Sequence, residues 1–168
     1  MTPAILLLAF VTLERLAELW LARRNTAALI AQGALEFAPG HYPLIVALHA
    51  AWLAGLWWLG WERPLHAGWL ALFVGLQFAR LWVLATLGRR WTTRIIVLPG
   101  APLVRHGPYR FLSHPNYVVV IGEIAVLPLA IGLPFYALAF SILNAAVLAI
   151  RIRAEQAALE QNAHVGRA

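Results

Sequence analysis

The residues best suited to chemistry lie in one polar stretch, RHGPYRFLSHPNY, at residues 105–117. A second group, Arg151 and Glu155, follows a long apolar segment, and its two members are one helical turn apart. A glutamate accepts hydrogen bonds from an ammonium or hydroxyl group, and the planar fork of an arginine fixes a carboxylate or phenolate oxygen. These residue types indicate a pocket that binds a small organic molecule and aligns an oxygen nucleophile.

Missing residue types exclude several other chemistries. The chain has no cysteine, lysine or aspartate, which excludes thiolate nucleophiles, cysteine-ligated zinc, Schiff bases, Walker-type P-loops and the usual aspartate-held magnesium sites. No two glycines form a G-x-G pair, so the Rossmann fingerprint is absent. The histidines lack the local spacing of zinc motifs, and we therefore expect no metal site.

The composition is that of a membrane protein. Of the 168 residues, 62% are hydrophobic and 12% are charged, whereas a soluble domain usually carries about 25% charged residues. Long apolar runs predict an all-α integral membrane protein, a single domain with about five transmembrane helices. The runs place these helices at about residues 3–22, 42–61, 67–88, 117–131 and 134–153. Gly132 and Pro134 divide the last apolar stretch, which predicts a C-terminal helical hairpin.

The distribution of arginine predicts the orientation in the membrane. All thirteen basic residues are arginines. Ten of them lie in loop 23–41, loop 89–116 and the tail after Ile150, whereas the opposite side has only Arg63. The positive-inside rule then places the N-terminus outside and the C-terminus in the cytoplasm. The same rule accounts for the net charge of +6, so we expect no nucleic-acid partner.

The hairpin is expected to bring the two polar groups together. If its helices pack antiparallel about a turn near residue 133, Asn116 lies level with Arg151 and Glu123 faces Asn144. The His-Pro-Asn-Tyr segment then meets the arginine and glutamate of the last helix. Two polar clusters that are far apart in the sequence thus form one site.

Charged residues also occur inside the apolar runs. Glu14 and Glu18 in the first run and Arg80 in the third lie at similar depth, counted from the predicted cytoplasmic ends. Because intramembrane charges tend to pair or to line cavities, we favour a structural Glu–Arg pair between these helices; the alternative is a substrate tunnel. His49 is alone in the second run, where a satisfied core histidine is favoured over contact with a substrate.

The segment HGPYRFLSHPNY, followed by a hairpin and then RIRAEQAAL, resembles the isoprenylcysteine carboxyl methyltransferase family. The family pattern is roughly Gly-x-Tyr, then Arg-His-Pro-x-Tyr, then an arginine four residues before Glu-Glu-x-x-Leu. Here Ser113 replaces the arginine before His-Pro, and Gln156 replaces the second glutamate. The segments ERLAEL, ARRN, GALEF and HYPLIVALHAAW are similar to the small bacterial branch, the alkylpyrone and alkylresorcinol O-methyltransferase-like proteins.

The resemblance implies a methyltransferase that uses S-adenosyl-L-methionine, in a bacterial inner (plasma) membrane with its active site facing the cytoplasm. The cofactor region would comprise about residues 100–117 and 151–159, and Arg151 would lie at the reacting end of the substrate. The implied cofactor contacts are Leu103, Val104, Tyr109, His114, Pro115, Asn116, Tyr117 and Glu155.

The resemblance also implies the partners. The methyl group would go to an oxygen, a carboxylate or a phenol or enol, of a lipophilic small molecule reached from the bilayer. Long-chain alkylpyrones and alkylresorcinols are the first choice of acceptor, a prenylated cysteine carboxylate the second, and a phospholipid amine the third. For a phenol or enol, His106 or His114 is a candidate base. The pattern sets no oligomeric state.

Two other functions remain open. A membrane reductase of the steroid-reductase type would use NADPH and would need basic residues for its 2′-phosphate, which the arginines of loop 89–116 supply. In a non-enzymatic membrane scaffold, Gly107, Pro108 and Pro115 would serve only as turn residues, and a histidine would cap the next helix. Arg151 and Glu155 would then be an ordinary pair on a helix surface.

Overall fold

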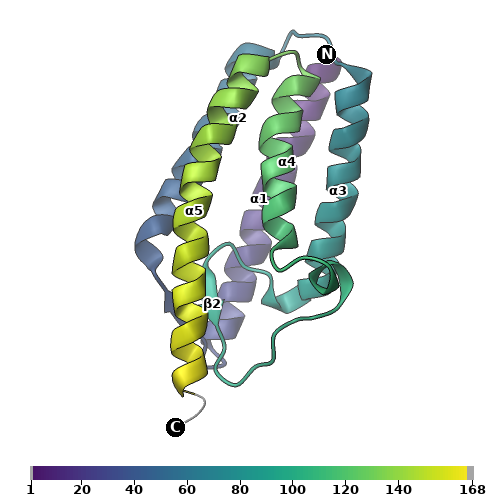
Figure 1. The fold of residues 1–168 in the computed structure, drawn as a ribbon. Helices are drawn as coiled ribbons and strands as arrows, with labels where there is room; N and C mark the ends of the chain where they lie inside the picture. The colour runs from purple at the N-terminus through teal and green to yellow at the C-terminus, as the bar shows by residue number, and fades with distance from the viewer. Residues whose placement is uncertain (1, 166–168) are drawn as a thin grey trace.

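The computed structural model describes residues 2–165, with side chains described as far as residue 158. Five helices stand side by side with roughly parallel axes (Figure 1). They are α1 (Pro3–Ile30), α2 (Tyr42–Gly60), α3 (Ala67–Leu87), α4 (Pro115–Ala130) and α5 (Pro134–Val165). The N-terminus lies at one end of the bundle, and the longest polar loop and the end of α5 lie at the other, the loop end (Figure 1).

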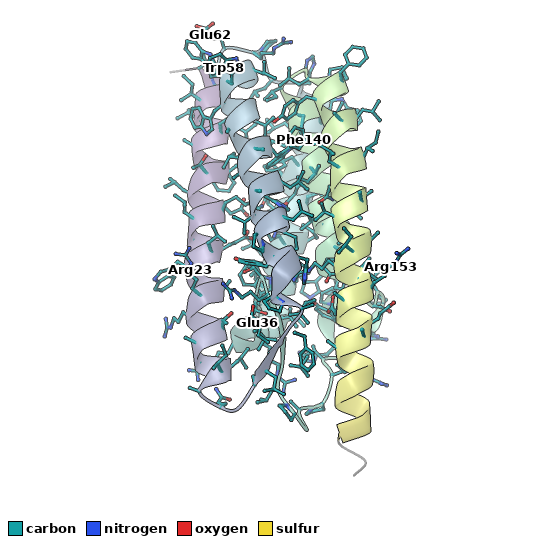
Figure 2. The ribbon with its side chains drawn as sticks, turned by 90° about the vertical axis from the view of Figure 1, so that its left-hand side faces the viewer. Arg23, Glu36, Trp58, Glu62, Phe140 and Arg153 are labelled. Carbon is teal, nitrogen blue, oxygen red and sulfur yellow. The ribbon has the colours of Figure 1, made fainter. Side chains whose placement is uncertain are left out.

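The outer surface of the bundle is apolar, as a lipid environment requires. Side chains project outward from the helices (Figure 2), and those more than half exposed include Phe10, Trp58, Phe78 and Phe135. Three segments are long and apolar enough to cross a membrane: Pro39–Gly60, Ala67–Arg90 and Pro134–Ala158. α1 has 28 residues but carries charges, and α4 is apolar but has 16 residues. The prediction of an all-α integral membrane protein is confirmed.

The predicted hairpin is present between α4 and α5. Leu133 N donates to Pro128 O at 2.8 Å, and Gly132 N donates to Leu129 O at 3.1 Å. Gly132 has a φ of +71°, which a residue without a Cβ adopts at little cost. Pro134 then opens α5 in the first turn, where its missing N–H leaves no helical hydrogen bond unmade.

Three predicted helix boundaries are wrong. α1 does not end near residue 22 but continues to Ile30, because its last turns pack on the loop end instead of entering a loop. Asn25 is buried there, and its Nδ2 donates to Gly88 O at 3.1 Å and to Trp91 O at 2.8 Å. α4 begins at Pro115, before residue 117, and α5 runs on to Val165, well past residue 153.

The polar loops contain a short antiparallel ribbon that the sequence analysis missed. β1 (Leu35–Phe37) pairs with β2 (Ile95–Val97), with Glu36 opposite Ile96. Arg94 Nη1 binds the Glu36 carboxylate at 2.9 Å across the ribbon, and its guanidinium lies 4.7 Å from the centre of the Tyr42 ring. The ribbon therefore ties the α1–α2 connection to the loop after α3.

Three short 3₁₀ turns complete the loop end: η1 (Pro39–His41), η2 (Gly88–Arg90) and η3 (Gly107–Arg110). η3 packs closely on the end of α3. Gly107 has a φ of +58°, and a Cβ at this position would collide with the side chain of Thr86. Both its backbone conformation and this close approach require glycine, so a turn role for Gly107 is supported.

A network of buried charges joins α1, α3 and α4. Arg80 Nη1 donates to Glu18 Oε1 at 3.1 Å, and Arg80 Nε donates to Glu123 Oε1 at 2.8 Å. Arg15 Nη1 donates to Glu18 Oε2 at 2.7 Å, and its Nη2 donates to Glu123 Oε2 at 3.1 Å. Gln77 Nε2 adds a hydrogen bond to Glu123 Oε1 at 3.1 Å. The predicted Glu–Arg pair between the first and third helices is confirmed, with Glu123 as a second acceptor.

The hairpin register predicted that Glu123 faces Asn144. Both side chains are buried. Among the described residues, however, no hydrogen bond joins them, because Arg80, Arg15 and Gln77 already occupy the Glu123 carboxylate.

We expect Arg80→Leu to destabilise the bundle, because it leaves two buried carboxylates without their main partner. Breaking a buried ion pair typically costs about 3–5 kcal/mol. The measurement is the free energy of unfolding in mixed micelles, followed by circular dichroism. Arg94→Leu is the control, since its pair with Glu36 is partly exposed and should be worth about 1 kcal/mol or less. Equal losses in the two variants would refute a stabilising role for the network.

Candidate active site

Two cavities meet near the loop end of the bundle. The first, here the bundle cavity, has a volume of about 320 Å³ and lies between α1, α2, α4 and α5. Most of its lining is apolar, including Leu16, Leu19, Ile45, Val46, Leu53, Val120, Val147 and Leu148. The second, here the loop cavity, has a volume of about 760 Å³ and lies between β2, the segment after it, η3 and the facing ends of α4 and α5. One cavity suits a hydrocarbon and the other a polar molecule.

The two cavities share one wall. It is formed by five residues that line both of them: Trp91, Thr92, Asn116, Tyr117 and Arg151. We call this group the junction. Asn116 and Arg151, which were predicted to lie level, both line the same two cavities, and their proximity is confirmed to that extent. A molecule in either cavity therefore meets the same side chains.

Tyr117 and Arg151 form the centre of the junction. Arg151 Nε donates to Tyr117 Oη at 3.0 Å, and the Tyr117 hydroxyl donates to Glu155 Oε2. Arg151 Nη1 donates to Thr93 O at 2.7 Å. The tyrosine hydroxyl thus connects the guanidinium to the carboxylate, and a backbone carbonyl fixes the other side of the guanidinium.

His114 lies beside this group at the start of α4. Its ring stacks on that of Tyr117 with centroids 5.0 Å apart and an interplanar angle of 12°. Its Nδ1 is 3.9 Å from Glu155 Oε2, so the two attract each other when the imidazole is protonated. His114 is the N-cap residue of α4 by position, but its side chain makes no capping hydrogen bond.

The remaining predicted cofactor residues surround the loop cavity. Leu103, Val104 and Tyr109 line it together with the junction. Burial, with a contribution from the charge of Glu155, raises the pKa of Tyr109 to about 12, so this side chain remains a neutral phenol. Pro115 is buried in the first turn of α4 and is not among the lining residues.

The predicted intramembrane residues divide between two places. Glu18, Arg80 and His49 line the bundle cavity. Glu14 does not, and its carboxylate lies 3.4 Å from Arg15 Nη2. The network that stabilises the bundle is therefore also part of a cavity wall.

Several residues of the site were missed in the sequence. Trp91 is 3% exposed and lines both cavities, and its Nε1 has no hydrogen-bond partner among the described residues. The one feature of the sequence that could have indicated Trp91 was its position just after the third apolar run. Thr93 contributes its backbone carbonyl, and a carbonyl leaves no mark in a sequence. Arg15 and Asn144 also line the bundle cavity.

The loop cavity is electropositive. Four arginines line it besides Arg151: Arg90, Arg94, Arg105 and Arg110. Arg90 Nη1 donates to Pro102 O at 2.6 Å, and Arg94 pairs with Glu36. In the described part of the chain, Arg105 and Arg110 have no hydrogen-bond or ion-pair partner, which leaves them for an anionic group of a ligand.

Comparison with known proteins found a family match and two relatives. Residues 69–161 match the model of the isoprenylcysteine carboxyl methyltransferase (ICMT) family. The chain is 39% identical over 169 residues to the uncharacterized protein YpbQ of Bacillus subtilis, covering 93% of this chain and 96% of that protein. It is 28% identical over 160 residues to an uncharacterized protein of Haemophilus influenzae, covering 86% and 88%. No solved structure matches significantly.

We expect Tyr117→Phe to lower the free energy of unfolding, because the hydroxyl joins two charged groups. Hydrogen bonds to charged groups are worth about 1.5–3 kcal/mol each. Tyr42→Phe is the matched control, since its hydroxyl pairs only with neutral Thr93 Oγ1 at 3.1 Å and should cost about 1 kcal/mol. Chemical denaturation in detergent measures both. A smaller loss for Tyr117→Phe than for Tyr42→Phe would show that Tyr117 does not hold the junction together.

Proposed function

We propose, from the premise that this chain belongs to the isoprenylcysteine carboxyl methyltransferase family, that it transfers a methyl group from S-adenosylmethionine to an oxygen of a lipophilic molecule. At family level the protein is a membrane methyltransferase. The observation that carries the finer proposal is the junction, where a polar and an apolar cavity share Tyr117 and Arg151. A shared wall of this kind lets a polar cofactor in one cavity meet a lipophilic substrate in the other.

The residues of the loop cavity fit this cofactor. Glu155 offers a carboxylate for an ammonium or for ribose hydroxyls, and Tyr109 offers a neutral phenol. Asn116 Oδ1 is buried without a partner among the described residues. Because buried polar atoms are nearly always paired, this oxygen is suited to a donor of the ligand. When bound, S-adenosylmethionine supplies an electrophilic methyl group on a positively charged sulfur.

The residues of the junction suit an oxygen nucleophile. Arg151 is held at Nε and Nη1, so its fork has a fixed direction and can position a carboxylate or phenolate oxygen. Holding both reagents in alignment supplies most of the acceleration in such a transfer. A carboxylate acceptor has no proton to lose. A phenol or enol must lose one, and His114 is the base beside the junction.

The acceptor reaches the junction from the bilayer. Leu16 of α1 and Val46 of α2 line the bundle cavity and are 58% and 39% exposed, so we place the entrance between these two helices. Long-chain alkylpyrones or alkylresorcinols are the first acceptors to test, then a prenylated cysteine carboxylate, then a phospholipid amine. The loop end, which gathers the arginines, would face the cytoplasm of a bacterial plasma membrane.

One observation favours a second candidate, an NADPH-dependent membrane reductase. Arg105 and Arg110 line the loop cavity, and neither has a hydrogen-bond or ion-pair partner in the part of the chain that the structure describes. A 2′-phosphate would suit them. Titration with both cofactors separates the two functions.

We expect S-adenosylhomocysteine, and not NADPH, to raise the melting temperature of the detergent-purified protein. A ligand that binds only the folded state stabilises it by about 2.7 kcal/mol at a hundredfold excess over Kd. Glu155→Gln should weaken this stabilisation, whereas Glu62→Gln should keep it because Glu62 is exposed at the opposite end of the bundle (Figure 2). Stabilisation by NADPH alone would replace the methyltransferase with the reductase.

We expect Arg151→Ala to keep S-adenosylhomocysteine affinity within a few-fold but to reduce methyl transfer by about 100-fold, since misplacing a reagent by about 1 Å has this effect. The assay counts labelled methyl groups in the organic phase after incubation with 5-pentadecylresorcinol or N-acetyl-S-farnesylcysteine. Arg153→Ala is the control, because Arg153 is exposed and points away from the bundle (Figure 2). Undiminished transfer by Arg151→Ala would remove this residue from the reaction.

A further inference from the structure

The bundle cavity contains a group of three polar side chains that lies deeper in the bundle than the junction. His49 of α2, Asn144 of α5 and Arg15 of α1 all line it, within walls that are otherwise mostly apolar. Asn144 is only 4% exposed. A polar group at this depth is costly unless its hydrogen bonds are made. The hydrogen-bond partners of these three side chains therefore indicate the role of the group.

The partners within the protein do not account for these three side chains. His49 Nδ1 lies 2.9 Å from Ile45 O, and since a carbonyl only accepts, the neutral imidazole carries its proton there and Nε2 is an acceptor. Arg15 Nε has no hydrogen-bond partner within the part of the chain that the structure describes. Among the described residues, none forms a hydrogen bond with the Asn144 amide or with His49 Nε2. The charge network of Arg80 uses the terminal nitrogens of Arg15 and nothing of His49 or Asn144.

The depth of this group follows from helix geometry. Tyr42 and Arg151 lie at one level, because both bind Thr93. His49 is seven residues beyond Tyr42 in α2, and Asn144 is seven residues before Arg151 in α5. At a rise of about 1.5 Å per residue, both lie about 10 Å deeper in the bundle than the junction. Counting residues along α2 and along α5 therefore gives the same depth for His49 and Asn144.

We propose that His49 and Asn144 form a second substrate subsite that binds a hydroxyl or keto oxygen of the lipophilic acceptor, about 10 Å from the oxygen that is methylated. This inference rests on the proposed function and narrows its substrate class. His49 Nε2 accepts from a hydroxyl, the Asn144 amide both donates and accepts, and Arg15 Nε adds a donor. The acceptor is then a long-chain molecule with two oxygen functions, and a plain prenyl or alkyl chain fits less well.

The test is a hydroxyl scan of ligand binding. The probes are dodecanoic acid, whose carboxylate suits Arg151, and a set of dodecanoic acids with one hydroxyl at successive positions. Affinity is measured by calorimetry on the full chain in detergent. We expect one position, about two-thirds of the way along the chain, to bind about fivefold more tightly than plain dodecanoic acid, as one added hydrogen bond allows.

Variants assign the effect to the subsite. In Asn144→Leu and His49→Phe the ratio of the affinities for the hydroxylated and the plain acid should fall to about one, whatever the affinity for the plain acid. Leu148→Ala, which alters the apolar wall, should weaken the binding of both acids and keep the wild-type ratio. A flat scan in the wild type, absence of binding by every acid, or a preference that survives in both subsite variants would overturn the subsite. Because the scan needs no cofactor, failure of S-adenosylhomocysteine binding would instead overturn the proposed function.

Discussion

The structure depends first on the need to pair Arg80 inside an apolar bundle. Glu18 of α1 and Glu123 of α4 approach its guanidinium from two sides, so one side chain of α3 fixes three helices relative to one another. Removing Arg80 would leave Glu18 and Glu123 with Arg15 as their one remaining arginine partner among the described residues, and a buried charge that loses a partner is costly. Since Glu18 and Arg80 also line the bundle cavity, a structural role and a role in the cavity wall are not alternatives here. The same side chains do both.

The second constraint is the register of the α4–α5 hairpin. The turn closed by Pro128 and Gly132 sets which residues of the two helices lie level. At the other end of the hairpin, Tyr117 then meets Arg151 and Glu155 of α5. A one-residue change in the turn would rotate α5 by about 100° relative to α4, because a helix has about 3.6 residues per turn. The distant turn therefore determines the geometry of the junction.

The sequence predicted the features that arise from apolar runs, turn residues and helical spacing. These were the five helices, the hairpin, the Glu18–Arg80 pair and the approach of the His-Pro-Asn-Tyr segment to Arg151. It missed what depends on tertiary contacts. The last turns of α1 are helical because Asn25 binds the backbone at Gly88 and Trp91, and no local pattern reports such a partner. The three-residue strands of the ribbon are too short to show an alternation.

The bonds of Tyr117 couple the two cavities. Its hydroxyl has one proton, which goes to Glu155 in the wall of the loop cavity, and the same oxygen accepts from Arg151, which lines both cavities. A cationic donor that binds Glu155 competes with Tyr117 for the carboxylate. If the hydroxyl is displaced, the hydrogen bond that orients Arg151 Nε weakens, while Thr93 O still holds Nη1. A guanidinium held only at Nη1 can turn about that nitrogen, so the direction in which Arg151 points depends on the Tyr117 hydroxyl.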